Sequence, residues 1–267
     1  MQSGQHKCVE QAGAVVEIIN PNAINLSFQP IILVCEHASN FIPEELNDLG
    51  LDLEILESHV AWDIGAYQLA KNISKILNAA LISSKISRLI YDCNRAPVEI
   101  SAIPEKCEEF EILGNKTLSS TEREERVTRF YRPFYELLEK TITSAMINNR
   151  EPIIVTIHTF TPKYFGKFRE VEIGIIHDRD SRFADNVLDV MAEKEEYNVK
   201  RNEPYGPKDA VTHTLKEHAI KNGLLNVMIE VRNDLVTDEP NKIASFLSKG
   251  ILAATKNILQ KKGREHA

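Results

Sequence analysis

Pro30-Ile-Ile-Leu-Val-Cys35 is an unbroken apolar stretch that runs directly into the polar pair Glu36-His37. An apolar run of this length, without alternating polar residues, is typical of a strand buried on both faces of a parallel sheet. Residues 152–157 and 225–231 have much the same character. Ligands of such sheets bind outside the carboxyl ends of the strands, so the polar residues that follow these runs are the first candidates for a functional site.

Helical periodicity alternates with the strands along the chain. We predict further strands at 80–84, 89–91 and 171–177, and helices over 63–77, 121–148, 181–194, 210–222 and 241–259. Residues 97–118 have little periodicity and are expected to form a long loop. This alternation predicts a fold of the α/β class, a three-layer α/β/α sandwich around a mixed, mainly parallel sheet. No repeat or composition break divides residues 1–267, so we expect a single domain.

Two helix starts carry capping signals. Asp63 stands where the N-cap of the helix over 63–77 is expected. For the helix over 121–148, either Ser120 with Arg123 or Thr121 with Glu124 has the spacing of a capping box.

Composition excludes several functions. The 267 residues carry 32 Lys+Arg and 39 Asp+Glu, a formal charge of −7, which argues against nucleic acid as a partner. No apolar run approaches the roughly 20 residues that span a bilayer, and the first residues lack the pattern of a signal peptide. The sparse cysteines, without C-x-x-C spacing, favour a reducing compartment. We therefore expect a cytoplasmic protein without a nucleic-acid or membrane partner; composition does not indicate its oligomeric state. The cysteines are Cys8, Cys35, Cys93 and Cys107.

Several polar side chains follow the predicted strands and should therefore meet at one edge of the sheet. A zinc hydrolase needs three protein ligands, typically two histidines and a carboxylate, with one position left for water. His37, His158 and one acid can supply that set. The alternative for each histidine is a loop residue that makes an ordinary hydrogen bond. The residues that follow the strands are Glu36, His37, Asp92, Asn94, Arg95, His158, Glu230, Arg232 and Asn233.

The acids have alternatives of their own. Glu230 lies within the apolar segment 227–231, where a carboxylate is costly to bury unless it is paired or has a chemical role. A salt bridge to Arg232 or to another arginine would explain it equally well. For Asp63 the alternative is a helix cap, and for the segment 92–95 it is a turn.

Five segments in one order resemble the N-formylglutamate amidohydrolase family, over roughly residues 30–255. They are Val34-Cys-Glu-His-Ala-Ser39, Trp62-Asp-Ile-Gly-Ala66, Ser87-Arg-Leu-Ile-Tyr-Asp-Cys-Asn-Arg95, His158-Thr-Phe-Thr-Pro162 and Ile229-Glu-Val-Arg-Asn-Asp-Leu235. The resemblance implies a fold related to that of the zinc carboxypeptidases and one bound Zn²⁺, or another divalent ion with similar ligands.

The resemblance also implies residue roles. His37 and His158 match the histidine ligands of the metal. The carboxypeptidases place a glutamate ligand three residues after the first histidine; that position is Asn40 here, so Asp63 resembles the displaced ligand, with Glu36 as its rival.

Other matches concern catalysis and substrate binding. Glu230 is similar to the general base of the related enzymes. Arg88, Asn94 and Arg95 resemble residues that polarise the scissile carbonyl and bind the substrate carboxylate. The expected pocket extends to Thr212, His213 and His218, for which the alternative is a Gly/Pro turn leading into a solvated helix.

The function that the resemblance implies is that of a zinc-dependent amidohydrolase acting on a small anionic N-acyl amino acid. N-formyl-L-glutamate, cleaved to glutamate and formate in histidine catabolism, is the expected substrate. One alternative is an amidase or carboxypeptidase acting on a peptide or cell-wall fragment, which needs a longer, open cleft. Another is a metal-free binding protein on the same scaffold.

Overall fold

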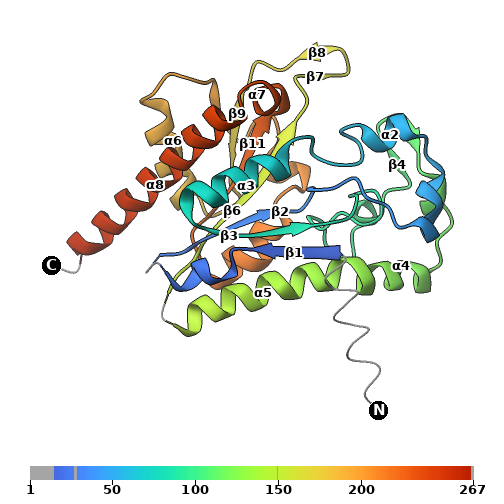
Figure 1. Ribbon diagram of the computed structural model, residues 1–267, viewed down its shortest axis with the longest axis horizontal. Helices are drawn as coiled ribbons and strands as arrows, with labels where there is room; N and C mark the ends of the chain where they lie inside the picture. The colour runs from blue at the N-terminus through green and yellow to red at the C-terminus, as the bar shows by residue number, and fades with distance from the viewer. Residues whose placement is uncertain (1–14, 27–28, 149, 266–267) are drawn as a thin grey trace.

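The computed structural model describes residues 15–26, 29–148 and 150–265, which form a seven-stranded sheet between two layers of helices (Figure 1). The four central strands β3, β2, β6 and β11 are mutually parallel, whereas β1 and β9 are antiparallel to their neighbours β3 and β11. The sheet is therefore mixed and mainly parallel, as predicted. In spatial order its strands are β1 (Val16–Ile19), β3 (Ala80–Ser84), β2 (Ile31–Cys35), β6 (Ile153–Phe160), β11 (Asn226–Arg232), β9 (Ile173–Ile176) and β10 (Val199–Arg201).

Helices cover both faces of the sheet. α3 (Ala66–Leu77), α6 (Arg182–Ala192) and α8 (Pro240–Glu265) pack on one face, and α4 (Ser120–Arg126), a π-helical turn at Val127–Tyr131 and α5 (Arg132–Ile147) lie on the other (Figure 1). Side chains alternate between the two cores: Leu33 packs with α3, and Ile32 with α5. Because both faces of β2 are buried, its sequence is apolar at every position.

Short elements complete the fold. α2 (Leu53–Glu57) and α7 (Asn233–Asp238) precede α3 and α8, and two hairpins, β4 (Lys106–Cys107) with β5 (Phe110–Glu111) and β7 (Lys163–Tyr164) with β8 (Lys167–Phe168), project from the loops. Short 3-10 or π segments lie at Pro21–Asn25, Glu44–Gly50, Ile100–Ala102, Leu113–Asn115, Pro207–Asp209, Leu215–Ala219 and Ile220–Asn222. None of the helices described has the length and apolar character needed to cross a membrane.

Several local predictions were wrong. The segment 89–91 is a turn, in which the Ile90 N–H bonds the Ser87 carbonyl, and β1 and β10 were not predicted. α3 begins at Ala66 after Gly65, whose φ of 86° favours glycine, so Asp63 is not the N-cap. The helical stretch over 121–148 is interrupted by the π-helical turn, and residues 210–222 form π and 3-10 turns rather than an α-helix.

Two further details concern caps and cysteines. The capping box of α4 joins Ser119 and Glu122, one residue before the first pair predicted. Cys35, Cys93 and Cys107 are free thiols, and Cys8 lies outside the described residues.

Candidate active site

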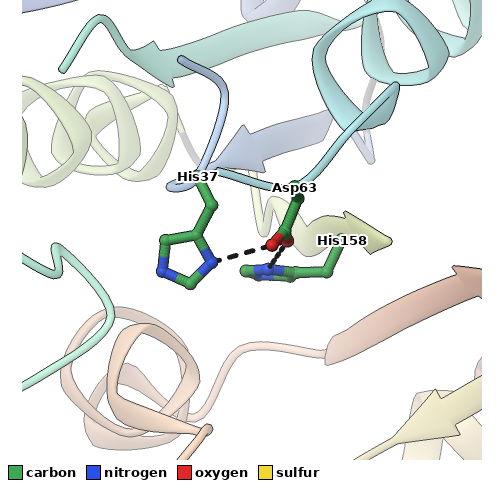
Figure 2. Close-up of side chains that lie close together, drawn as sticks. All are labelled: His37, Asp63 and His158. Atoms are coloured by element: carbon green, nitrogen blue, oxygen red, sulfur yellow. Dashed lines mark hydrogen bonds and ion pairs between the residues drawn. The ribbon is translucent and has the colours of Figure 1, made fainter. Parts of the chain in front are cut away.

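Three side chains from separate elements meet at the carboxyl ends of the parallel strands. His37 follows β2, Asp63 precedes α3, and His158 lies within β6. Their ligand atoms lie within 4.8 Å of one another, and all three residues are buried. Figure 2 shows the Asp63 carboxylate between the two rings, with Oδ2 2.9 Å from His158 Nδ1 and 3.5 Å from His37 Nδ1. Two imidazoles and a carboxylate at this spacing are a donor set that zinc accepts.

Backbone contacts hold this group together. β2 and β6 are neighbouring parallel strands, so the segment after β2 lies beside His158. The Asp63 N–H donates to the His37 carbonyl at 3.0 Å, and the Thr159 N–H lies 3.3 Å from Asp63 Oδ2. The group is therefore fixed by the sheet and by two turns rather than by one continuous motif.

Glu230 lies beside the group because β11 pairs with β6 in a register that sets it directly opposite His158. The side chain is buried, and its Oε2 has no hydrogen-bond partner. Burial raises the pKa of Glu230 to about 7, with a further contribution from Asp63, although His158 and Arg88 act in the opposite direction. The alternative of a salt bridge to Arg232 is wrong, since Arg232 pairs with Asp234 at 2.9 Å and with Glu172 at 3.4 Å. A carboxylate in this condition is suited to accept a proton.

Arg88 contacts two members of the group. Its Nη2 donates to Asp63 Oδ1 at 2.6 Å and to His37 Nδ1. Burial alone would raise the pKa of Asp63, but Arg88, His37 and His158 outweigh it and hold that pKa well below its usual value. Asp63 is consequently ionised, as a metal ligand must be.

Asp92 and Glu36, two acids expected at this edge of the sheet, lie behind the histidines rather than within the group of potential ligands. Asp92 Oδ1 lies 2.7 Å from His37 Nε2. Glu36 Oε2 lies 3.1 Å from His158 Nε2, on the opposite side of the ring from Asp63. The group of potential ligands thus contains Asp63 and not its rival Glu36. The only sequence signal for these contacts is that both acids follow a strand or its turn, which does not say what they touch.

The two acids are ionised for the same reason. Burial raises the pKa of each carboxyl, yet the neighbouring histidines outweigh it, so that the net pKa of both Glu36 and Asp92 is lowered. The Thr214 hydroxyl contributes at Glu36, and Arg95 and Arg88 contribute at Asp92.

A cavity of about 380 Å³ opens onto the group. Seven of the ten residues predicted for the site line it: His37, Asp63, Arg88, Asn94, Arg95, His158 and Glu230. The loop 97–118 forms one wall through its β4–β5 hairpin, and Tyr164 from the β7–β8 hairpin contributes to the lining as well. A pair between His59 and Glu108, 3.0 Å apart, fastens the loop to the segment before α3.

Asn94 and Arg95 make other contacts as well. The buried Asn94 amide donates to the Val211 carbonyl at 2.6 Å and accepts from the Thr214 N–H at 3.0 Å. One of its two amide N–H groups is therefore used within the protein. Arg95 Nη1 bonds the carbonyls of Ala210 and Asn94, at 2.6 and 3.1 Å, and no carboxylate of the described chain forms an ion pair with it.

The structure does not bring the other three predicted pocket residues to this cavity. The Thr212 hydroxyl donates to Asp178 at 2.6 Å. His213 bonds the Tyr131 hydroxyl at 2.8 Å and lines a different cavity, against the π-helical turn and α5. His218 packs on the ring of Tyr135, 4.4 Å between centroids, where burial lowers its pKa to about 4.

Fold and site together define a class. An α/β/α sandwich that gathers two histidines, an aspartate and an unpaired buried glutamate around a small cavity is equipped for hydrolysis. The chain belongs to the N-formylglutamate amidohydrolase family, whose model matches residues 29–237. Membership indicates an amidohydrolase that acts on a small N-acyl amino acid.

Solved structures agree on the fold. A gene product of Agrobacterium tumefaciens is 46% identical, with a TM-score of 0.88, and the match covers 93% of this chain and 98% of that one. An N-formylglutamate amidohydrolase from Ralstonia eutropha is 20% identical, with a TM-score of 0.60 and coverage of 94% and 99%, a likeness of fold. Among curated proteins, none matches the sequence.

Proposed function

We propose that this chain is a zinc-dependent amidohydrolase that cleaves N-formyl-L-glutamate to glutamate and formate. The observation that carries the proposal is the buried His37–Asp63–His158 group with the unpaired Glu230 beside it. The proposal takes the chain as one domain, because all four residues gather at the carboxyl ends of the parallel strands of one sheet. The reaction would serve histidine catabolism in the cytoplasm.

His37, Asp63 and His158 would hold the ion. Their donor set, two imidazoles and one carboxylate, fits zinc, and other divalent ions with the same ligand preference would compete for it. When bound there, zinc lowers the pKa of water to about 7 and polarises the formyl carbonyl.

Glu230 supplies the proton transfer. Its carboxylate takes a proton from the attacking water and delivers it to the amide nitrogen, the C–N bond breaks, and formate and the free amine of glutamate leave. A pKa near 7 suits both halves of this transfer, since the group must accept a proton and then release it.

The cavity favours a small substrate over a peptide or cell-wall fragment. At about 380 Å³ it is near the lower end of ligand pockets, and the 97–118 loop walls it on one side. Arg95, which has no carboxylate partner in the described chain, offers a planar donor pair to a substrate carboxylate. Arg88, held against Asp63, is placed to stabilise the developing oxyanion.

Formate release tests the proposal. Zinc-loaded protein is expected to release formate from N-formyl-L-glutamate, and more slowly from N-formyl-L-leucine, which lacks the second carboxylate. The rate of free-amine release from N-acetyl-L-glutamate, compared with the rate from the formyl substrate, measures how strictly the enzyme selects the acyl group. Inactivity on all three substrates, with zinc bound, would remove the small-acyl function and leave the peptide amidase as the next candidate.

A further inference from the structure

Glu36 is a buried carboxylate whose two oxygens make no hydrogen bond of ordinary geometry. It is 1% exposed, and Oε1 and Oε2 are both without a hydrogen-bond partner. An ionised carboxylate in such surroundings is costly unless it interacts with another polar group. Two groups face it: His158 Nε2, which lies at 3.1 Å and also has no hydrogen-bond partner, and the Thr214 hydroxyl.

The two nitrogens of the His158 ring thus face different acids. Nδ1 lies 2.9 Å from Asp63, within the potential ligand group, and Nε2 lies beside Glu36. The nitrogens of an imidazole point away from each other across the ring, so a metal held with Asp63 at Nδ1 is out of reach of Glu36.

His37 has the same arrangement. Its Nδ1 faces Asp63 at 3.5 Å, and its Nε2 lies 2.7 Å from Asp92, where the alignment is that of a hydrogen bond. Each histidine of the group therefore has one nitrogen toward Asp63 and a second carboxylate behind the other nitrogen. Acids in that outer position fix which ring nitrogen carries the proton and make the ring a stronger ligand.

We propose that Glu36 is a positioning residue that holds the proton of His158 on Nε2, so that Nδ1 presents its lone pair to the metal. The proposal rests on the proposed function, because it assigns His158 to the zinc site. It differs from the sequence-based alternative in which Glu36 is itself a ligand. A carboxylate ligand must reach the ion and contributes its charge, whereas a positioning residue needs only an acceptor oxygen at Nε2.

The test compares Glu36→Gln with Glu36→Leu. Glutamine keeps an acceptor oxygen, and leucine of similar volume does not. Because removing one member of a buried pair is destabilising, circular dichroism first verifies that each variant is folded. Thr156→Val is the matched control, since Thr156 is buried on the same strand two residues before His158 and its hydroxyl is also unpartnered. Should the leucine variant not fold, Glu36→Met serves in its place.

The readouts are the zinc Kd, from competition with a chromophoric chelator, and the ¹⁵N shifts of the His158 ring in zinc-loaded protein. Glu36→Leu is expected to weaken zinc binding about 10- to 100-fold. Glu36→Gln and Thr156→Val should stay within about threefold of wild type, and wild type should show a protonated Nε2.

Three results overturn the proposal while zinc binding by the wild type stands. The first is an unchanged zinc Kd in Glu36→Leu. The second is a loss of zinc affinity in Glu36→Gln as large as that in Glu36→Leu, which would make Glu36 a charged ligand. The third is metal bound to Nε2 of His158. A wild-type protein that binds no zinc refutes the proposed function, and the Glu36 proposal with it. Wild-type protein that binds zinc but releases no formate refutes only the function.

Discussion

Glu230 is the residue on which the chemistry depends most. It is a carboxylate in the middle of an apolar strand, buried, without an ion pair among the described residues, and set opposite His158 by the strand register. Such a group is a cost to the fold that a purely structural role does not explain. A role as the proton carrier, beside the group of potential metal ligands, explains why this carboxylate is buried there.

Glu230→Gln is expected to keep zinc and lose turnover. The amide preserves size and polarity but cannot accept the proton, so kcat for formate release should fall about 10²- to 10⁴-fold with the zinc content unchanged. Steady-state kinetics and metal analysis on the same sample check this, with the exposed Glu193→Gln as the control. Turnover retained in Glu230→Gln would remove it as the base.

At the scale of elements, the segment 207–223 is attached to the rest of the fold through Asn94. The Asn94 side chain satisfies two backbone groups of this segment, the Val211 carbonyl and the Thr214 N–H. The resemblance implies a substrate-binding role for Asn94, and these contacts add a structural one. Its amide holds the segment against the turn that carries Arg95.

Asn94→Ala is therefore expected to destabilise the protein. Two backbone groups lose their partner, at about 1–3 kcal/mol each, so the free energy of unfolding should fall by about 2–6 kcal/mol in urea denaturation. Asn94→Asp keeps the acceptor for Thr214 and should lose roughly half as much. A rise in KM without loss of stability would instead support the substrate-binding role.

His218 makes the same region sensitive to acid. Burial against Tyr135 lowers its pKa to about 4 in the folded protein, below the usual 6.5. A lowered histidine pKa means that the unfolded chain binds a proton first, so the stability present above pH 6.5 is lost as the pH falls toward 4.

His218→Gln should remove part of this loss. Between pH 7 and pH 4.5, the wild-type free energy of unfolding is expected to fall by about 2 kcal/mol more than that of the variant, in urea denaturation at both pH values. A parallel fall in the two proteins would show that His218 is protonated in the fold.

The strands that are buried on both faces, and the site residues at or after their ends, could be predicted from the sequence. β2, β6 and β11 were predicted because uninterrupted apolar runs leave few alternatives, and His37, His158 and Glu230 follow from them. The edge strands β1 and β10 are only 4 and 3 residues long and carry charged residues, so they lack that signal.

The errors concern contacts between distant segments. Nothing local shows that Asp63 leaves the helix start to face His158, which is 95 residues away. His213 and His218 were expected near the substrate, but their position depends on how the 207–223 segment packs against α5 and Tyr131. Tertiary packing, not the local pattern, decides such cases.

At the scale of the whole molecule, a chain of net charge −7 is proposed to bind a doubly negative substrate. Most acids of the cavity already have partners: Asp63 has Arg88, Asp92 has His37, and Glu108 has His59. Among the described residues, the Arg95 guanidinium hydrogen-bonds only backbone carbonyls, although its charge also helps to lower the pKa of Asp92. Attraction of the substrate is thus local rather than a property of the overall charge.

Arg95→Lys tests this local attraction. Lysine keeps the charge but not the two parallel donors, so KM for N-formyl-L-glutamate should rise about tenfold or more, with a smaller change in kcat. The surface variant Arg129→Lys, at a position that pairs with Glu45 and lies over the Phe130 ring, should leave both constants unchanged. An unchanged KM in Arg95→Lys would place the substrate carboxylate elsewhere.

The central claim is that His37, Asp63 and His158 hold the ion that makes this protein a hydrolase. The most direct measurement is the zinc content per chain after zinc loading and dialysis, for the wild type and for His158→Ala, with formate release measured on the same samples. We expect one zinc per wild-type chain, loss of zinc and of activity together on chelation or in His158→Ala, and recovery of both when zinc is returned to the wild type. Wild-type protein that releases formate at full rate with no metal bound would contradict the account.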